Sequence, residues 1–418
     1  MRIQPRFHRG KTALVLAGGG LTGSVYEIGA LRAIDDLLTN RTVNDFDIYV
    51  GTSAGSLVST LLANGMTPKS MLQVINGTHP FIQPLQRNHL FNFNMGEIWR
   101  RGAALPRKLL QAGSHYLRHS GDMTFFDFVW SLGEALPSGF YDNLSLEQYL
   151  RHSLHQAGFS NHFADLEKEL YIIATDLDAG ERAVFGCGHM SDVPISLAVA
   201  ASSAVPLVYK PVRIGDREYI DGGMRGTASI DLAIERGAEL VLCINPLVPY
   251  DNSRRDAIPF LGHDGGYLSE KGVQGVGNQV LRIMMHSGLN YHVKQVRRMH
   301  PEVDIILIEP RMDDYQMHFY NIMRYSAQLT IAQHGFESVT LDLAEDYQGY
   351  KDILSRHGIS ISRRLVIEEL TEIWQSGYNP QVVRRVLSSR AAYYERRDTP
   401  LHKLNETLAD LELMLEEA

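Results

Sequence analysis

The pentapeptide Gly51-Thr52-Ser53-Ala54-Gly55 constrains the fold most strongly, because it joins a short apolar run to a helical repeat. Residues 47–50 before it are typical of a buried strand, and residues 54–63 are typical of a helix. The pattern G-x-S-x-G in this context predicts a sharp turn that exposes the serine hydroxyl at the end of a sheet. Glycines suit the turn because side chains there would collide with the neighbouring strand and helix. We therefore predict that Ser53 is a nucleophile.

A second glycine-rich turn lies upstream and also connects a strand pattern to a helix pattern. Residues 12–16 form a short apolar run, residues 18–23 form the turn, and apolar side chains then recur at helical spacing from 24 to 38. Strand, helix, strand and helix joined by short turns predict a parallel sheet with helices packed on its faces. Further strand patterns lie at residues 169–174, 183–185, 217–220, 240–244 and 304–308.

The upstream turn, Gly18-Gly19-Gly20-Leu21-Thr22-Gly23, has two functional interpretations. It satisfies G-x-G-x-x-G, the dinucleotide-binding fingerprint. That fingerprint requires an acidic residue at the end of the second strand, whereas Asp45 and Asp47 precede this strand and its end runs into the serine turn. The other interpretation is an oxyanion hole, in which glycine N–H groups converge on a developing negative charge at a helix N-terminus. We favour the oxyanion hole over the dinucleotide site and over a plain tight turn.

The best candidate for a general base is Asp221 in Asp221-Gly222-Gly223, which follows the strand pattern at residues 217–220. A serine needs a base within hydrogen-bond reach, and a carboxylate can serve. The two glycines let the backbone turn away and leave the carboxylate directed into the cleft. The similar tripeptide Asp264-Gly265-Gly266 has no strand pattern before it, so we interpret it as a turn.

A Ser-His-Asp triad is the minor alternative, since the chain has 17 histidines. In the α/β-hydrolase order the histidine follows the acid. The histidines that satisfy this order are His263, His286, His292, His300 and His334. None of them has a local sequence signature.

Composition and charge exclude several classes of protein. Apolar residues make up 44% and charged residues 21% of the 418 residues, which excludes a disordered, collagen-like or disulfide-stapled chain. The formal net charge of −8 gives no overall basic field that would attract nucleic acid. No apolar run reaches the roughly 18 residues of a transmembrane helix, and only Cys187 and Cys243 are present, which fits a reducing compartment. We expect a cytoplasmic protein.

The segment at about residues 80–140 interrupts the alternation of strands and helices with prolines and aromatic residues. It also contains a basic cluster, which consists of Arg100, Arg101, Arg107, Lys108 and Arg118. Basic residues beside apolar ones suit a lid or a membrane-facing flap, while a solvated helix or loop is the alternative. The first interpretation implies a peripheral association with membranes.

Two later stretches have a distinct pattern. Residues 262–277 are rich in glycine and predict a long loop. After Pro310 strand patterns cease and helical periodicity continues to the end, where leucines between Leu401 and Leu415 form a stripe about two heptads long. These C-terminal helices could cap a cleft, mediate self-association or complete the fold, and the sequence leaves the oligomeric state open.

Taken together, the three motifs resemble those of the patatin-like phospholipases. The glycine turn at 18–23, the serine turn at 51–55 and Asp221-Gly222-Gly223 occur in that family's order. Two flanking stretches, residues 174–181 and 200–211, are also similar. The resemblance covers about residues 11–310, apart from the insert at about 80–140.

The resemblance implies an α/β fold of three layers, in which a mostly parallel central sheet is flanked by helices. It implies a catalytic domain over residues 11–310 and leaves residues 311–418 as a helical C-terminal region. It further implies a Ser–Asp dyad without a metal or other cofactor, in which Ser53 is the nucleophile and Asp221 the general base. The expected oxyanion-hole donors are the N–H groups of Gly18, Gly19 and Gly20. The other motif glycines are Gly23, Gly51, Gly55, Gly222 and Gly223.

The sequence departs from the family's pattern at three positions. Thr22 stands where the family usually has a basic residue, and Thr227 and Ser229 stand where it often has Asn and Pro. None of these changes removes a predicted catalytic group. The resemblance therefore implies hydrolysis of acyl esters of phospholipids or related lipids. The alternatives are a catalytically silent scaffold that binds membrane or protein and, less favoured, a dinucleotide-binding oxidoreductase.

Overall fold

A computed structural model describes residues 10–103, 136–253, 266–313 and 325–388 of the chain. Its centre is a mixed sheet with the strand order β10-β9-β1-β2-β4-β8-β7, and β5 pairs with β4 outside this path. The strands are β1 (Lys11–Leu16), β2 (Ile48–Thr52), β4 (Glu169–Asp176), β5 (Arg182–Phe185), β7 (Val212–Ile214), β8 (Arg217–Asp221), β9 (Ala238–Ile244) and β10 (Asp304–Ile308). A separate parallel pair is formed by β3 (Gly139–Tyr141) and β6 (Leu207–Tyr209).

The sheet is mostly parallel, as the sequence predicts. Strands β10, β9, β1, β2 and β4 are parallel neighbours, whereas β5, β7 and β8 join antiparallel. A parallel strand with both faces covered is apolar along its whole length. Strand β1 shows this, because every residue after Lys11 is buried.

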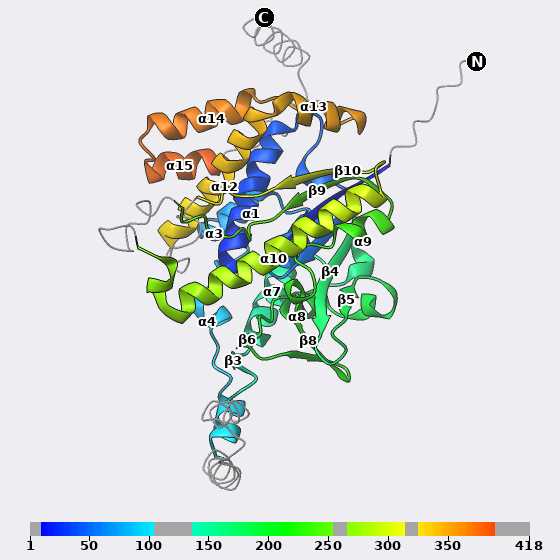
Figure 1. The fold of residues 1–418 in the computed structure, drawn as a ribbon, viewed down its shortest axis with the longest axis vertical. Helices are drawn as coiled ribbons and strands as arrows, with labels where there is room; N and C mark the ends of the chain where they lie inside the picture. The colour runs from blue at the N-terminus through cyan, green and yellow to red at the C-terminus, as the bar shows by residue number, and fades with distance from the viewer. Residues whose placement is uncertain (1–9, 104–135, 254–265, 314–324, 389–418) are drawn as a thin grey trace, which may run out of the picture.

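Helices cover both faces of the sheet and produce the predicted three-layer α/β fold (Figure 1). On one face, α1 (Gly20–Leu37), α2 (Ala54–Ala63), α8 (Ile195–Ser202) and α12 (Tyr325–Glu345) enclose a core that includes Leu14 and Leu16. On the other face, α9 (Ile230–Glu235) and α10 (Gly272–Met299) pack on a core that includes Val15. Alternate side chains of one strand thus enter opposite cores. The other helices used below are α3 (Pro68–Ile75), α4 (Arg87–Leu90), α7 (Leu144–Ala157), α13 (Tyr347–Arg356), α14 (Arg364–Gln375) and α15 (Pro380–Leu387).

The C-terminal helix α12 packs directly along α1. A Cβ at Gly29 would lie 1.9 Å from the carbonyl oxygen of Ala332, and one at Gly335 would lie 2.3 Å from that of Tyr26. Phe336 of α12 is fully buried in the same core as α1. The helices that follow residue 310 therefore share a hydrophobic core with the sheet. The leucine stripe at 401–415 lies outside the described residues.

The prediction of a long loop at residues 262–277 is wrong in its second half. Helix α10 begins at Gly272 and contains Gly275 and Gly277. A Cβ at Gly275 would lie 2.9 Å from the carbonyl oxygen of Leu268, so the glycine lets the preceding turn fold back onto the helix. Residues 262–265 lie outside the described part of the chain.

The insert at about residues 80–140 is described only at its two ends. Arg100 and Arg101 lie on a helical segment, where the Nε of Arg101 donates to Oε1 of Glu97 at 2.7 Å. Arg107, Lys108 and Arg118 lie outside the described residues. In the described part of the chain, no helix combines the length and the hydropathy needed to cross a bilayer.

The glycine contact between α1 and α12 predicts a cost for added volume. We expect Gly29→Ala to lower the free energy of unfolding by about 1–3 kcal/mol, because the methyl group would force the two helices apart. Urea denaturation followed by circular dichroism measures this. Gly288→Ala in α10, where a Cβ meets open space, is the matched control and should raise stability by about 0.5–1 kcal/mol. Equal effects of both substitutions would contradict the close packing of α1 on α12.

Candidate active site

Strand β4 brings the predicted nucleophile and base together. Along one edge of β4, Thr52 at the end of β2 lies opposite Ile173, and Asp221 at the end of β8 lies opposite the next residue, Ala174. Strand β5 pairs over the same stretch of β4, so it must occupy the other edge. Strands β2 and β8 therefore meet end to end. Ser53, which directly follows Thr52, lies at this junction.

Ser53 sits in a sharp turn between β2 and α2. Its φ of +53° is unusual for a residue with a side chain, and it lies directly before the first residue of α2. The flanking glycines are required by space: a Cβ at Gly55 would lie 2.4 Å from the carbonyl oxygen of Leu16, and one at Gly51 would lie 2.5 Å from the Cα of Ser56. The turn thus brings α2 back against the sheet and leaves Ser53 at the end of the sheet.

Ser53 and Asp221 are in direct contact. Ser53 Oγ donates to Asp221 Oδ2 at 2.5 Å, and the N–H of Gly223 donates to Oδ1 at 2.8 Å. The backbone of Asp221 is also held, because its N–H donates to the carbonyl of Ala204 at 2.9 Å and its carbonyl accepts from Thr175 Oγ1 at 3.0 Å. Ser53 is 5% exposed and Asp221 is 2% exposed. The carboxylate is therefore fixed on the serine hydroxyl in a largely dry environment.

Burial changes the acidity of this carboxyl group. It raises the pKa of Asp221 to about 6, and the hydrogen bonds from Ser53 and the Gly223 N–H lower it only in part. A carboxylate with this pKa is ionised at neutral pH and is a stronger base than an ordinary aspartate. These are the properties that a general base requires.

The upstream glycine turn lies against Ser53. A Cβ at Gly18 would lie 3.1 Å from the Cβ of Ser53. Within the described residues, the N–H groups of Gly18 and Gly19 donate to no protein acceptor. Gly20 is the first residue of α1, where N–H groups have no intrahelical acceptor. The turn thus presents free backbone donors beside the serine.

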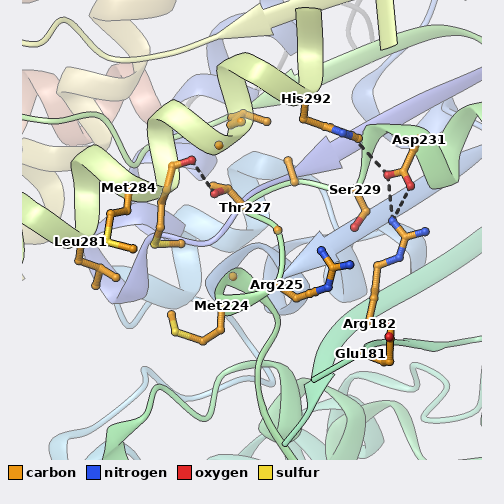
Figure 2. Close-up of a pocket in the computed structure, with 16 residues that line it drawn as sticks. Glu181, Arg182, Met224, Arg225, Thr227, Ser229, Asp231, Leu281, Met284 and His292 are labelled. Atoms are coloured by element: carbon orange, nitrogen blue, oxygen red, sulfur yellow. Dashed lines mark hydrogen bonds and ion pairs between the residues drawn. The ribbon is translucent and has the colours of Figure 1, made fainter. Parts of the chain in front are cut away.

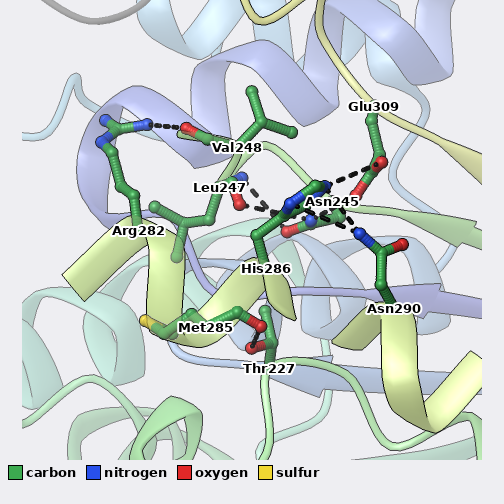
Figure 3. Close-up of polar contacts among 9 residues, drawn as sticks. All are labelled: Thr227, Asn245, Leu247, Val248, Arg282, Met285, His286, Asn290 and Glu309. Carbon is green, nitrogen blue, oxygen red and sulfur yellow. Dashed lines mark hydrogen bonds and ion pairs between the residues drawn. The ribbon is translucent and has the colours of Figure 1, made fainter. Parts of the chain in front are cut away.

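Pro246, which follows β9, supports the glycine turn from behind. A Cβ at Gly19 or Gly23 would lie 2.6 Å or 2.9 Å from the Cγ of Pro246. Asn245 fixes this proline, because its Oδ1 accepts from the N–H of Leu247 at 3.1 Å and its Nδ2 donates to Oε1 of Glu309 at 2.7 Å (Figure 3). Sequence analysis assigned these residues no role, and no local pattern distinguishes them.

Two serines of α8 and its C-terminus brace the nucleophile. The N–H of Ser53 donates to Ser202 Oγ at 2.8 Å, and Ser202 in turn donates to the carbonyl of Ile173 at 2.5 Å. Ser203 Oγ donates to the carbonyl of Ser53 at 3.2 Å. The only sequence signal for this brace was the pair of serines in the alanine-rich stretch at 200–206.

The histidines considered for a triad have other partners. His286 Nε2 lies 3.3 Å from Oε2 of Glu309 and 3.2 Å from Nδ2 of Asn290 (Figure 3). His292 faces Asp231 at 3.4 Å (Figure 2). His300 contacts a glutamate, and His334 lies on α12. None of these four histidines is a hydrogen-bond partner of Ser53 or Asp221. His263 and Asp264 lie outside the described residues.

Ser53 opens into an apolar pocket of about 260 Å³. A second apolar cavity of about 80 Å³ lies beside it, between α1, α2, α3 and α7. Both are lined by Leu21, Ser24, Leu57 and Leu85. The arrangement extends apolar space from the serine into the interior. Among the described residues, no group of three or more His, Cys, Asp or Glu side chains is arranged to hold a metal ion.

Comparison with known proteins identifies the family of this chain. A sequence model of the patatin-like phospholipases matches residues 14–234, more than half of the chain. The chain belongs to the patatin-like phospholipase family. The match contains both Ser53 and Asp221 and all the glycines of the three motifs.

The chain is also similar to individual proteins of known sequence. It is 23% identical to the probable lipid hydrolase 463L of Invertebrate iridescent virus 6 over 233 residues, which are 56% of this chain and 66% of the relative. It is 27% identical to YqhO of Bacillus subtilis (strain 168) over 221 residues, 50% of this chain and 62% of the relative. The matched segments thus span somewhat less than two thirds of these relatives.

Two solved structures are similar at lower identity. The structure of VipD from Legionella pneumophila is 14% identical, with a TM-score of 0.35, and the match covers 81% of this chain and 67% of that chain. The structure of ExoU in complex with SpcU from Pseudomonas aeruginosa is 15% identical, with a TM-score of 0.31. The match covers 94% of this chain and 72% of that chain.

The residues after the Asp221-Gly222-Gly223 turn contact α10. Thr227 stands where the family often has Asn, and its Oγ1 donates to the carbonyl of Met285 in α10 at 3.0 Å (Figure 3). A Cβ at Gly223 would lie 2.8 Å from the terminal methyl of Met285. Helix α10 therefore packs directly on the turn that follows Asp221.

The raised pKa of Asp221 predicts a pH-dependent stability. A carboxyl group whose folded-state pKa of about 6 lies above 3.8 favours the folded state when protonated, and this contribution is lost as the pH rises through 6. Asparagine cannot ionise and keeps the shape. We therefore expect the free energy of unfolding of Asp221→Asn to exceed that of the wild type at pH 8, by an amount on the order of 1–3 kcal/mol. This difference in stability should be smaller at pH 4.

Chemical denaturation at pH 4, 6 and 8 measures this difference. Asp216→Asn, at an exposed position beside the same strand, is the matched control and should show little change. A stability difference for Asp221→Asn that does not vary with pH would contradict the assigned pKa.

Proposed function

We propose that this protein is a serine-dependent hydrolase that cleaves carboxylic ester bonds of phospholipids or related lipids. The observation that carries the proposal is the 2.5 Å hydrogen bond from Ser53 Oγ to Asp221 Oδ2, beside an apolar pocket. Membership of the patatin-like phospholipase family and the similarity to a probable lipid hydrolase support the substrate class. We propose the catalytic domain as residues 11–310 and residues 311–418 as its helical C-terminal region.

The proposed reaction begins with attack of Ser53 Oγ on the ester carbonyl. Asp221 accepts the hydroxyl proton through the hydrogen bond that already joins them, and its raised pKa suits this transfer. The carbonyl oxygen becomes an oxyanion, to which the N–H groups of Gly18, Gly19 and Gly20 donate. One such donor contributes about 2.7–4 kcal/mol to the lowering of the barrier. The alcohol then leaves with the proton from Asp221.

The second half of the reaction releases the acyl group. The acyl group is now an ester of Ser53, and Asp221 takes a proton from a water molecule that attacks its carbonyl. The same N–H groups stabilise the second oxyanion. The free fatty acid leaves and Ser53 recovers its proton. The N–H of Ser53 itself stays on Ser202, so the serine turn keeps its shape through both steps.

The two adjacent cavities are proposed to hold the acyl chain. They are lined mainly by side chains from α1, α2, α3 and α7, and their exposed surface is largely apolar. Leu57 lines both cavities, whereas Leu61, one turn further along α2, lines only the inner one. Leu57 would therefore contact the acyl chain nearer to Ser53 than Leu61 does.

A serine-directed fluorophosphonate probe tests the nucleophile. We expect the wild type to be labelled, Ser53→Ala to remain unlabelled, and Asp221→Asn to be labelled about 10²–10⁴-fold more slowly because the general base is lost. In-gel fluorescence and intact-mass spectrometry provide the readout. Ser191→Ala, at a partly exposed serine in another part of the fold, should be labelled like the wild type.

Two outcomes would contradict the proposed dyad. Labelling of Ser53→Ala at the wild-type rate would place the reactive serine elsewhere. Failure of the folded wild type to react, in the presence of detergent, would favour the catalytically silent scaffold.

The acyl-chain assignment predicts a change in chain-length preference. We expect Leu57→Trp to reduce hydrolysis of long-chain p-nitrophenyl esters about tenfold relative to the butyrate, because the indole would fill the space at the boundary that Leu57 forms between the two cavities. A factor of ten corresponds to about 1.4 kcal/mol, which is within the cost of forcing an apolar chain into filled space.

Leu61→Trp is the matched control for depth. Since Leu61 lines only the inner cavity, this variant should impair only the longest esters. Equal loss on short and long esters in both variants would contradict the assignment of the cavities to the acyl chain.

A further inference from the structure

Helix α10 has an outer face that no described part of the chain covers. The exposed apolar residues along its first four turns are Val273, Val276, Val280, Leu281, Ile283 and Met284, and all but Leu281 lie on this outer face. Tyr291 continues the stripe and is 66% exposed, and Val273 is 91% exposed. The spacing of three or four residues places this stripe on one side of the helix. Water-exposed valine, methionine and tyrosine gathered on one helix face are typical of an interaction surface.

The inner face of α10 is fully engaged. Gln279 exchanges hydrogen bonds with the backbone of Tyr250, and Arg282 Nη1 donates to the carbonyl of Val248 at 3.1 Å (Figure 3). His286 meets Glu309 one turn later, and Leu289 is buried in the core. The exposed stripe is therefore not the side of α10 that packs in the core, because the opposite side already packs on the sheet.

Helix α10 is positively charged, whereas the whole chain has a negative net charge. Its 28 residues contain no Asp or Glu and four basic residues, which are Arg282, Lys294, Arg297 and Arg298. The whole chain has a formal net charge of −8. Lys294 and Arg298 are exposed and continue the spacing of the apolar stripe beyond Tyr291. Outward-facing apolar residues, then a tyrosine, then basic residues form the pattern of a helix that lies in an anionic lipid interface.

The exposed face of α10 lies near the turn that follows Asp221. A pocket of about 790 Å³ lies between α10 and the residues after Asp221, with Leu281 and Met284 on the helix side and Met224 on the turn side (Figure 2). Gly223, whose N–H donates to Asp221, lines the same pocket. A lipid that leaves the interface beside the stripe would thus meet the pocket wall next to the catalytic base.

We infer that the outer face of α10 is the surface with which this protein docks on anionic lipid. The helix, about 42 Å long, lies along the interface, with Val273, Val276 and Val280 inserted among the acyl chains. Tyr291 lies at headgroup depth, and Lys294 and Arg298 contact acidic headgroups. The inference rests on the proposed function in one respect: docking would give the protein access to its lipid substrate.

Sedimentation with phosphatidylserine–phosphatidylcholine vesicles tests this surface in the full-length protein. We expect the triple substitution Val273→Asp, Val276→Asp and Val280→Asp to weaken vesicle binding about tenfold or more. All three valines are exposed to solvent, so the variant should fold. Leu341→Asp with Ile367→Asp, on exposed apolar positions of α12 and α14, is the matched control and should bind like the wild type.

A second variant separates charge from apolar insertion. Lys294→Gln with Arg298→Gln should reduce binding to phosphatidylserine vesicles about tenfold at low salt, and the difference should shrink as salt is added. Binding of both variants at the wild-type level would overturn the inference. A wild type that forms a dimer which the triple variant loses would also overturn it, since the face would then bind a second copy.

Hydrolysis of a short water-soluble ester keeps this test independent of the proposed function. We expect the triple variant to retain wild-type activity on p-nitrophenyl butyrate, because its substitutions lie outside the pockets at Ser53 and at the base. Vesicle binding without ester hydrolysis in the wild type would contradict the proposed chemistry and leave the docking face standing. Ester hydrolysis by the wild type, with unchanged vesicle binding in the triple variant, would contradict the docking face and leave the proposed chemistry standing.

Discussion

The pairing of β4 with two strands that meet end to end determines the geometry of the candidate site. Because β2 and β8 occupy successive positions on one edge of β4, the residue after β2 and the last residue of β8 lie within hydrogen-bond distance. The two chain directions matter, since β2 is parallel to β4 and β8 is antiparallel to it. Their carboxyl ends therefore converge on one point, although 167 residues of chain separate Ser53 from Asp221.

This convergence has an energetic cost that the surrounding structure must offset. Ser53 holds a backbone conformation that costs on the order of 1–3 kcal/mol for a residue with a side chain. Asp221 is a buried carboxyl group, and no cation among the described residues lies beside it. The N–H of Ser53 donates to Ser202 Oγ, and the hydroxyls of Ser203 and Thr175 donate to the carbonyls of Ser53 and Asp221. These hydrogen bonds and the packing of α10 on Gly223 hold both groups in place. The resulting strain and desolvation are located where the proposed chemistry needs a basic carboxylate and an exposed hydroxyl.

Sequence reasoning identified the parts of the site that have a local pattern. Ser53 could be recognised because its strand, turn and helix are consecutive, and Asp221 because glycines follow a strand. Their contact, however, depends on β4, whose register no local pattern reveals. Pro246 and Ser202 support the site from distant segments and look ordinary in the sequence. The glycines at 272–277 suggested a loop, yet packing of the other face of α10 on the sheet stabilises a helix there.

The dependence of ester hydrolysis on pH tests the Ser–Asp dyad most directly. With p-nitrophenyl butyrate as substrate, the dyad predicts a rate that is constant above about pH 7 and falls with a single ionisation near the Asp221 pKa of about 6. The same profile should persist when His286 is replaced by Gln, because that histidine contacts Glu309 and not the dyad. A rate that stays constant down to pH 4, or a profile that shifts with His286→Gln, would contradict Asp221 as the general base.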